Sequence, residues 1–80
     1  MPKLYKAIVE VDDRATFIRD VFQARNRLFA SKVRVTTVEG SLRLVHIESE
    51  DYLCVEDVLI VELGKSVKDA EQTITSRFVP

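Results

Sequence analysis

Residues 33–51, VRVTTVEGSLRLVHIESED, contain the pattern that decides the expected fold. Over residues 33–38 polar and apolar side chains alternate and β-branched residues dominate, which is typical of a strand. Gly40 follows within a short turn, because glycine can adopt the positive φ of a tight hairpin. Residues 42–47 then alternate again. The stretch therefore predicts two antiparallel strands joined by a turn.

The segment before this hairpin predicts a strand followed by a helix. Residues 4–11 alternate as a half-buried strand does, and Asp12-Asp13 can accept hydrogen bonds from the first amides of a helix. Over residues 13–30 apolar side chains recur at the spacing of one buried helix face. Arg25 lies within this apolar stripe, so we expect its guanidinium to meet a carboxylate or to extend into water.

The segment after the hairpin predicts further strands. Residues 52–63 are interpreted as one long bent strand or two short ones, interrupted at Glu56-Asp57. Residues 66–69 carry a Ser-x-x-Asp cap pattern, for which we favour a polar loop over a helical turn. Residues 74–79 are a last, diluted strand pattern. This order predicts a mainly β fold with one helix, closed as a small barrel.

Composition narrows the class of protein. Eighty residues that are 46% hydrophobic suffice for one domain. The single Cys54 cannot form an internal disulfide, and the single His46 cannot build a His-rich metal site. The longest apolar run, residues 58–61, is far shorter than the roughly 20 residues that span a bilayer. We therefore expect a cytoplasmic protein without metal, cofactor or membrane contact. No nucleophile-and-base pattern accompanies His46, so we expect no enzyme activity.

Charge is distributed unevenly along the chain. Residues 1–43 hold nine basic and five acidic side chains, whereas residues 44–80 hold three basic and eight acidic ones. The net charge is only −1, so any anion site must be local. A chain polarised in this way can attract a second copy of itself or present one basic face. Ordinary solvated charge is the alternative interpretation.

The hairpin and its flanks resemble the Sm/LSm family. A helix leads into residues 33–40, Asp51 stands eleven residues after Gly40, and Ile47 occupies the apolar position four before Asp51. Residues 46–51 are similar to the corresponding part of bacterial Hfq. The family's second glycine and its base-binding asparagine have Val45 and Val55 in their places.

The resemblance implies a fold and an assembly. Residues 1–80 would be one Sm-like domain, with a strand extension over residues 1–11, a helix over residues 13–30 and an SH3-type antiparallel five-stranded barrel over residues 32–79. Edge strands and the two-signed charge predict a homo-oligomeric ring of roughly five to seven copies, because heterologous contacts must close or continue into filaments. The expected subunit contacts are Arg25, Val58 and Ile60.

The resemblance also implies binding of single-stranded nucleic acid, with RNA ahead of DNA. Within the loop that opens at Asp51, Tyr52 could stack on a base and Leu53 occupies the family's stacking position. Phosphates would meet basic side chains, of which Arg27, Lys32 and Arg34 are the candidates.

Two other interpretations stay open. Tyr52 could instead pack at a subunit contact, and the basic side chains could form a solvated helix flank. The chain would then be a homo-oligomeric protein-interaction scaffold that kept the barrel and lost nucleic-acid recognition.

Overall fold

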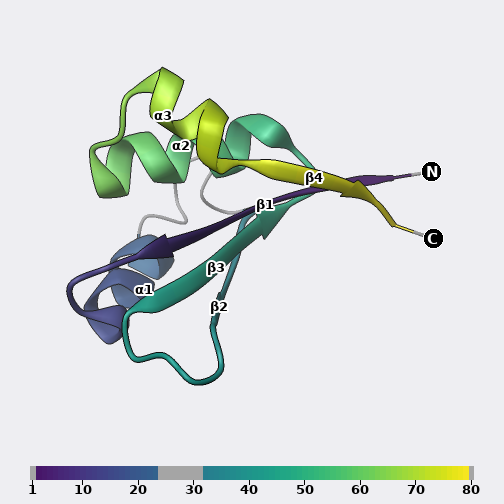
Figure 1. The fold of residues 1–80 in the computed structure, drawn as a ribbon. Helices are drawn as coiled ribbons and strands as arrows, with labels where there is room; N and C mark the ends of the chain where they lie inside the picture. The colour runs from purple at the N-terminus through teal and green to yellow at the C-terminus, as the bar shows by residue number, and fades with distance from the viewer. Residues whose placement is uncertain (1, 24–31, 80) are drawn as a thin grey trace.

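Four strands and three helices make up the described part of the computed structural model, which covers residues 2–23 and 32–79 (Figure 1). The four strands confirm the four segments predicted as strands outside residues 52–63. In chain order the elements are β1 (Lys3–Glu10), α1 (Arg14–Gln23), β2 (Arg34–Thr37), β3 (Leu44–Ser49), α2 (Tyr52–Leu63), α3 (Val67–Thr73) and β4 (Thr75–Phe78).

The strands form one antiparallel sheet in the order β2-β3-β1-β4 (Figure 1). The central strands β1 and β3 pair from Tyr5↔Ser49 to Glu10↔Leu44, and the two ends of the described chain lie together beside β4. With its helices this sheet has the β-α-β-β-α-β arrangement called split βαβ or ferredoxin-like, to which α3 is added.

The predicted five-stranded Sm-like barrel is therefore wrong. The sheet has four strands and stays open, with β2 and β4 at its two edges. The segment that should have closed the barrel, residues 52–63, is the helix α2. The hairpin on which the resemblance rested does form, since β2 pairs with β3 and Gly40 has φ +83° in the turn between them.

The helix α2 forms because its apolar side chains satisfy a helical spacing that the sequence interpretation passed over. Cys54, Val55, Val58 and Leu59 are all fully buried. In a strand, neighbours such as Val58 and Leu59 would point to opposite faces, whereas one helix face holds all four. Asp51 accepts a hydrogen bond from the Leu53 N–H at one end. At the other end Gly64, with φ +68°, donates to the Ile60 carbonyl.

Local caps also set the other two helices. The Asp13 carboxylate accepts from the Ala15 and Thr16 N–H groups, which confirms the predicted start of α1. The predicted end of this helix, near residue 30, lies outside the described residues. Ser66 accepts from the Asp69 N–H at 3.1 Å, so the Ser-x-x-Asp pattern opens α3 and the favoured polar loop is wrong.

One core joins the sheet to the helices. Val45 and Ile47 of β3 are completely buried, and all three helices supply buried side chains to the same cluster. The core therefore lies between the helices and one face of the sheet. Within residues 2–23 and 32–79, no helix is both long and apolar enough to cross a membrane. The buried cluster comprises Ala7, Val9, Val11, Phe17, Val21, Val33, Val45, Ile47, Cys54, Val55, Val58, Leu59 and Ala70.

Candidate binding face of the sheet

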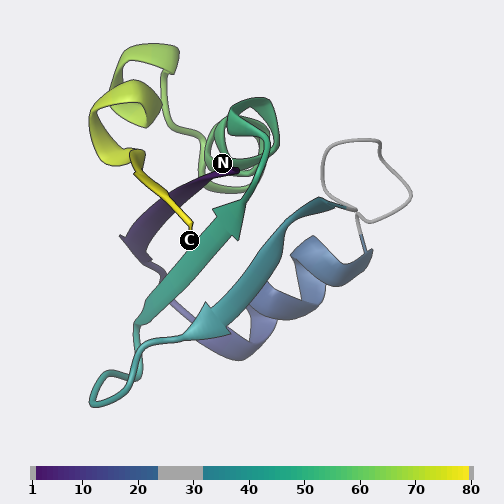
Figure 2. The same cartoon turned by 90° about the vertical axis from the view of Figure 1, so that its right-hand side faces the viewer.

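The sheet has one covered face and one open face. Ala7 and Val9 of β1 and Val45 and Ile47 of β3 point into the core, so the residues between them point to the opposite side. Figure 2 shows the same sheet from a second direction, with α1 partly behind β2 and α2 seen nearly end-on above β3. Across the register, the open face consists of Leu4, Lys6, Ile8, Glu10, Arg34, Thr36, Leu44, His46, Glu48, Thr75 and Arg77.

One end of this open face is basic. The register places Arg34, Glu48, Lys6 and Thr75 in a row across all four strands, with Arg77 in the adjacent row. Arg34 Nη1 lies 3.4 Å from Glu48 Oε1, and the Glu48 side chain is only 14% exposed while that of Arg34 is 76% exposed. The carboxylate is thus recessed and paired, and the cations reach solvent. We call Lys6, Arg34 and Arg77 the basic end.

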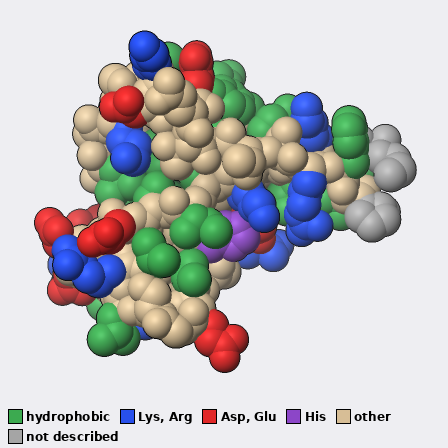
Figure 3. Space-filling view, viewed as in Figure 1, with side chains coloured by type: hydrophobic (Ala, Val, Ile, Leu, Met, Phe, Trp, Pro, Cys, Tyr) green, Lys and Arg blue, Asp and Glu red, His purple; other side chains and the backbone are tan. Residues whose placement is uncertain are grey.

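The centre of the open face is apolar around one imidazole. Ile8 is 52% exposed and sits opposite His46, while the neighbouring Leu44 is half-buried. In Figure 3 the only histidine lies between hydrophobic side chains on one side and Lys and Arg side chains on the other. His46 Nε2 is buried without a hydrogen-bond partner and lies 3.9 Å from Glu48 Oε2.

The other end of the open face carries both charge signs and is bound up in ion pairs. Arg43 Nε lies 3.4 Å from Glu10 Oε1, and Arg43 Nη2 lies 3.5 Å from Asp12 Oδ1. All three side chains are well exposed, and exposed ion pairs contribute little to stability. Two carboxylates share one guanidinium here, which makes this end a poorer anion site than the basic end.

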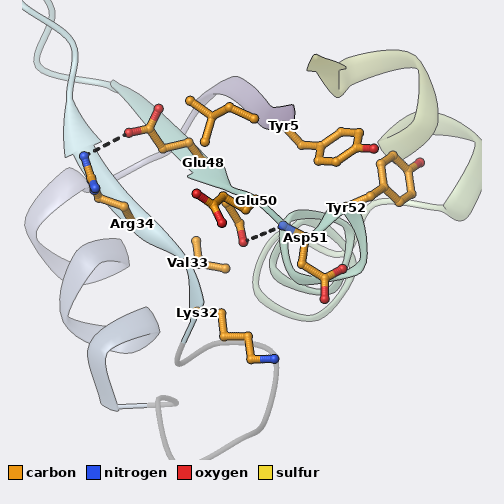
Figure 4. Close-up of a pocket in the computed structure, with 10 residues that line it drawn as sticks. Tyr5, Lys32, Val33, Arg34, Glu48, Glu50, Asp51 and Tyr52 are labelled. Atoms are coloured by element: carbon orange, nitrogen blue, oxygen red, sulfur yellow. Dashed lines mark hydrogen bonds and ion pairs between the residues drawn. The ribbon is translucent and has the colours of Figure 1, made fainter. Parts of the chain in front are cut away.

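A cavity of about 910 Å³ opens where β3 leads into α2 (Figure 4). Tyr5 and Tyr52 line one side of it and meet edge to face, with ring centroids 5.5 Å apart. Lys32 and Arg34 supply positive charge, but three acidic side chains line the same space: Glu48, Glu50 and Asp51. This balance of charge disfavours phosphate in the cavity.

The structure separates the residues that were expected to touch nucleic acid. Asp51, Tyr52 and Leu53 do not form a loop: Asp51 caps α2 and the other two lie in its first turn. Tyr52 is half-buried against Tyr5, and desolvation, then the nearby Glu56 carboxylate, raises the pKa of its phenol. Leu53 is 52% exposed.

Among the predicted basic contacts, Lys32 and Arg34 line the cavity, whereas Arg27 lies outside the described residues. Only Arg34 also belongs to the open face.

The expected subunit contacts are equally dispersed. Val58 is fully buried in the chain's own core, which leaves it no surface for a second copy. Ile60 is partly buried against that core, and Arg25 lies outside the described residues. Cys54 has no exposed surface, and burial raises the pKa of its thiol, which keeps it neutral inside the core.

The sequence interpretation missed Lys6, Ile8 and Arg77 as candidates. The alternation of residues 4–11 contained the signal for the first two. The sequence pattern did not give the position of the helices. That position decides whether the polar side of the strand faces solvent or a second layer. The register of β4, which brings Arg77 beside Leu4, comes only from the structure.

Comparison with models of known protein families, with curated proteins and with solved structures finds no match for this chain. Among the described residues, no group of three or more His, Cys, Asp or Glu side chains is placed to hold a metal ion. Function must therefore be argued from the open face itself.

Proposed function

We propose that the protein binds single-stranded nucleic acid, RNA ahead of DNA, across the open face of its sheet. The observation that carries the proposal is the basic end, where Lys6, Arg34 and Arg77 come from three different strands. The one carboxylate in the row of Lys6 and Arg34, that of Glu48, is recessed and already paired with Arg34. Phosphate contacts supply most of the affinity in such complexes, and they need cations that reach solvent.

The spacing of the strands suits an extended ligand. Neighbouring strands lie about 4.8 Å apart, so the distance from β2 to β4 is about 14 Å. Cations distributed over this width can contact more than one phosphate of a single strand that crosses the sheet. A mononucleotide would use only part of them, so we expect affinity to rise with the length of the oligonucleotide.

The apolar centre gives unpaired bases a surface next to these cations. Ile8 presents half of its surface to solvent, and the His46 ring lies opposite it. Sheets that bind single-stranded RNA commonly stack bases on aromatic side chains. Among the described open-face residues, the His46 ring is the only planar side chain of that kind apart from guanidinium groups. We therefore expect weak sequence preference and a strong dependence on salt.

A second candidate function is protein interaction, with the open face as the contact surface. The half-exposed Ile8 favours it, and so does the net charge of −1, since an exposed apolar centre can bind another protein without any phosphate. The two functions differ in which side chains matter. Nucleic acid needs the basic end first, whereas a protein partner needs the apolar centre first.

Fluorescence anisotropy with labelled oligouridine and oligothymidine at two salt concentrations tests the proposal. We expect binding that weakens with salt, with a slope that falls by about one per phosphate contact removed. The double change Lys6→Gln with Arg77→Gln should weaken binding to both oligomers and flatten that slope. The matched control is Lys68→Gln, an exposed lysine of α3 outside the open face, which should change nothing.

Absence of binding by the unchanged protein to either oligomer at low salt would overturn the proposal. Equal losses in the double variant and in Lys68→Gln would overturn the assignment to the basic end. If the unchanged protein binds neither oligomer, protein interaction becomes the favoured function.

A further inference from the structure

We propose that the outer edge of β4 pairs with the β4 edge of a second copy, so that two sheets join into one continuous antiparallel sheet. This inference does not depend on nucleic-acid binding. All four residues of β4 are exposed, and Phe78 is 63% exposed. An edge strand leaves a row of backbone N–H and C=O groups that another strand can pair with.

The alternation of backbone hydrogen bonds between β1 and β4 shows which backbone groups of β4 point outward at this edge. The Val79 N–H donates to the Pro2 carbonyl at 3.0 Å, one position beyond the pair Lys3↔Phe78. In an antiparallel ladder such bonded positions alternate, so Thr75 and Arg77 direct their backbone groups toward β1. Those of Ser76 and Phe78 point outward.

The hydrogen bonds on the other side of β1, toward β3, use the alternate residues of the strand. There the Val11 N–H donates to the Arg43 carbonyl at 2.8 Å, so the odd-numbered residues of β1 direct their backbone groups toward β3. The even-numbered residues, among them Leu4 and Lys6, are thereby left to bond β4, which is the pairing that the register of β4 requires.

The side chains of β4 select one register for a two-fold pair. If Arg77 faced its own counterpart, two guanidinium groups would lie directly opposite each other, which is destabilising. If Ser76 faces its own counterpart, Thr75 lies opposite Arg77, and Ile74 lies opposite Phe78 on the covered side. Two-fold symmetry forms this Ile74–Phe78 pair twice. In each pair the Phe78 N–H of one copy can donate to the Ile74 carbonyl of the other. The Ile74 N–H is not needed there, because it already donates to Ala70 in α3.

This self-complementarity is the reason for choosing a second copy as the occupant of the edge. A two-fold contact uses the same patch twice and closes on itself, so it yields a dimer and no filament. The two open faces would lie side by side, with Arg77 and Lys6 of each copy near the seam. The short strand limits the contact, and we expect a dimer that dissociates on dilution.

Sedimentation velocity over a wide range of protein concentration, without nucleic acid, tests the pairing. The unchanged protein should shift from monomer mass to dimer mass as concentration rises. Ser76→Pro removes an outward N–H that the chain's own ladder does not use, so the variant should fold and stay a monomer. The matched control is Thr37→Pro on β2. Its N–H also points outward, since the Val38 N–H donates to the Leu44 carbonyl, and this variant should still dimerise.

Cross-linking tests the register and covers the case in which Ser76→Pro fails to fold. Paired Ser76 positions would have Cα atoms about 5.5 Å apart, within the range that a disulfide spans. Ser76→Cys should therefore give a covalent dimer on oxidation, whereas Phe78→Cys should not. A monomer at every concentration overturns the proposal, as does a dimer that survives Ser76→Pro or is lost only in Thr37→Pro. Cross-linking of Phe78→Cys without Ser76→Cys overturns the register.

Discussion

The two faces of the sheet use the same four strands for different purposes. On the covered face Val45 and Ile47 have no exposed surface, while one position along β3 the open face presents His46 and, across from it, the half-exposed Ile8. Because neighbouring residues of a strand point to opposite faces, one residue contributes to the core and the next lies on the surface available for binding. Substitutions on the covered face should change unfolding, and those on the open face should change recognition.

The largest effect is expected on the covered face. Ile47→Ala removes a fully buried side chain from the middle of β3 and should lower the free energy of unfolding by about 2–5 kcal/mol. Urea denaturation followed by circular dichroism measures the loss. A change below about 1 kcal/mol would show that this face is not the core that the burial indicates.

A smaller effect is expected where α2 is fixed over that face. Asp51→Ala removes the carboxylate that accepts from the Leu53 N–H at 3.0 Å and should cost about 1 kcal/mol of unfolding free energy. Asp51→Asn is the matched variant, because asparagine caps helices nearly as well. If both variants lost the same stability, charge or another contact of Asp51 would be responsible, and the capping explanation would fail.

On the open face, Ile8→Ala should alter stability by about 1 kcal/mol or less, because the side chain is already half exposed. Oligonucleotide binding should weaken at the same time, with an unchanged salt slope, since an apolar contact releases no counterions. Denaturation measures the effect of Ile8→Ala on stability, and fluorescence anisotropy measures its effect on oligonucleotide binding. A loss as large as that of Ile47→Ala would remove the distinction between the faces.

The smallest effect concerns pH at the start of α1. Hydrogen bonds from the Thr16 N–H and hydroxyl lower the pKa of the Asp13 carboxyl below its usual value. The ionised form therefore stabilises the fold above the usual aspartate pKa, and this contribution is lost as pH falls through the lowered value. Asp13→Asn should show a shallower loss of stability with acid in pH-dependent thermal melts. If the pH profiles of Asp13→Asn and the unchanged protein coincided, the acid-dependent loss of stability could not be assigned to Asp13.

The segments of β1, β2 and β3 were predictable because their polar and apolar side chains alternate, and the hairpin had Gly40 to mark its turn; residues 74–79 carried only a diluted pattern. The start of α1 was predictable from Asp13. The helix over residues 52–63 was not predictable, because apolar side chains at Leu53 and Val61 extend the apolar pattern around the helix. Glu56-Asp57 was interpreted as an interruption of a strand, whereas it lies within α2. That single change of element opened the barrel into a sheet.

The candidate site was less accessible to sequence reasoning than the fold. Arg34 was identified as a basic contact, but its partners Lys6 and Arg77 lie far from it in the chain. Asp51, Tyr52 and Leu53 were assigned to a loop because α2 was interpreted as strand. Which strand face meets solvent is a property of the packed helices, and alternation alone cannot supply it.

The pairing of β1 with β3 also sets the order in which the chain can fold. Glu10 lies opposite Leu44, so pairing the two central strands closes a loop of more than 30 residues, while β2 and β3 are joined by a short turn. Long loops delay contact formation, so we expect the β2–β3 hairpin to form first and β1 to pair with it later. The edge strand β4 pairs only with β1, so it cannot join the sheet before β1 does. Until then the inner edge of β3 stays unpaired. Pulse-labelled hydrogen exchange should protect β3 amides bonded to β2 before those bonded to β1, and simultaneous protection would argue against this order.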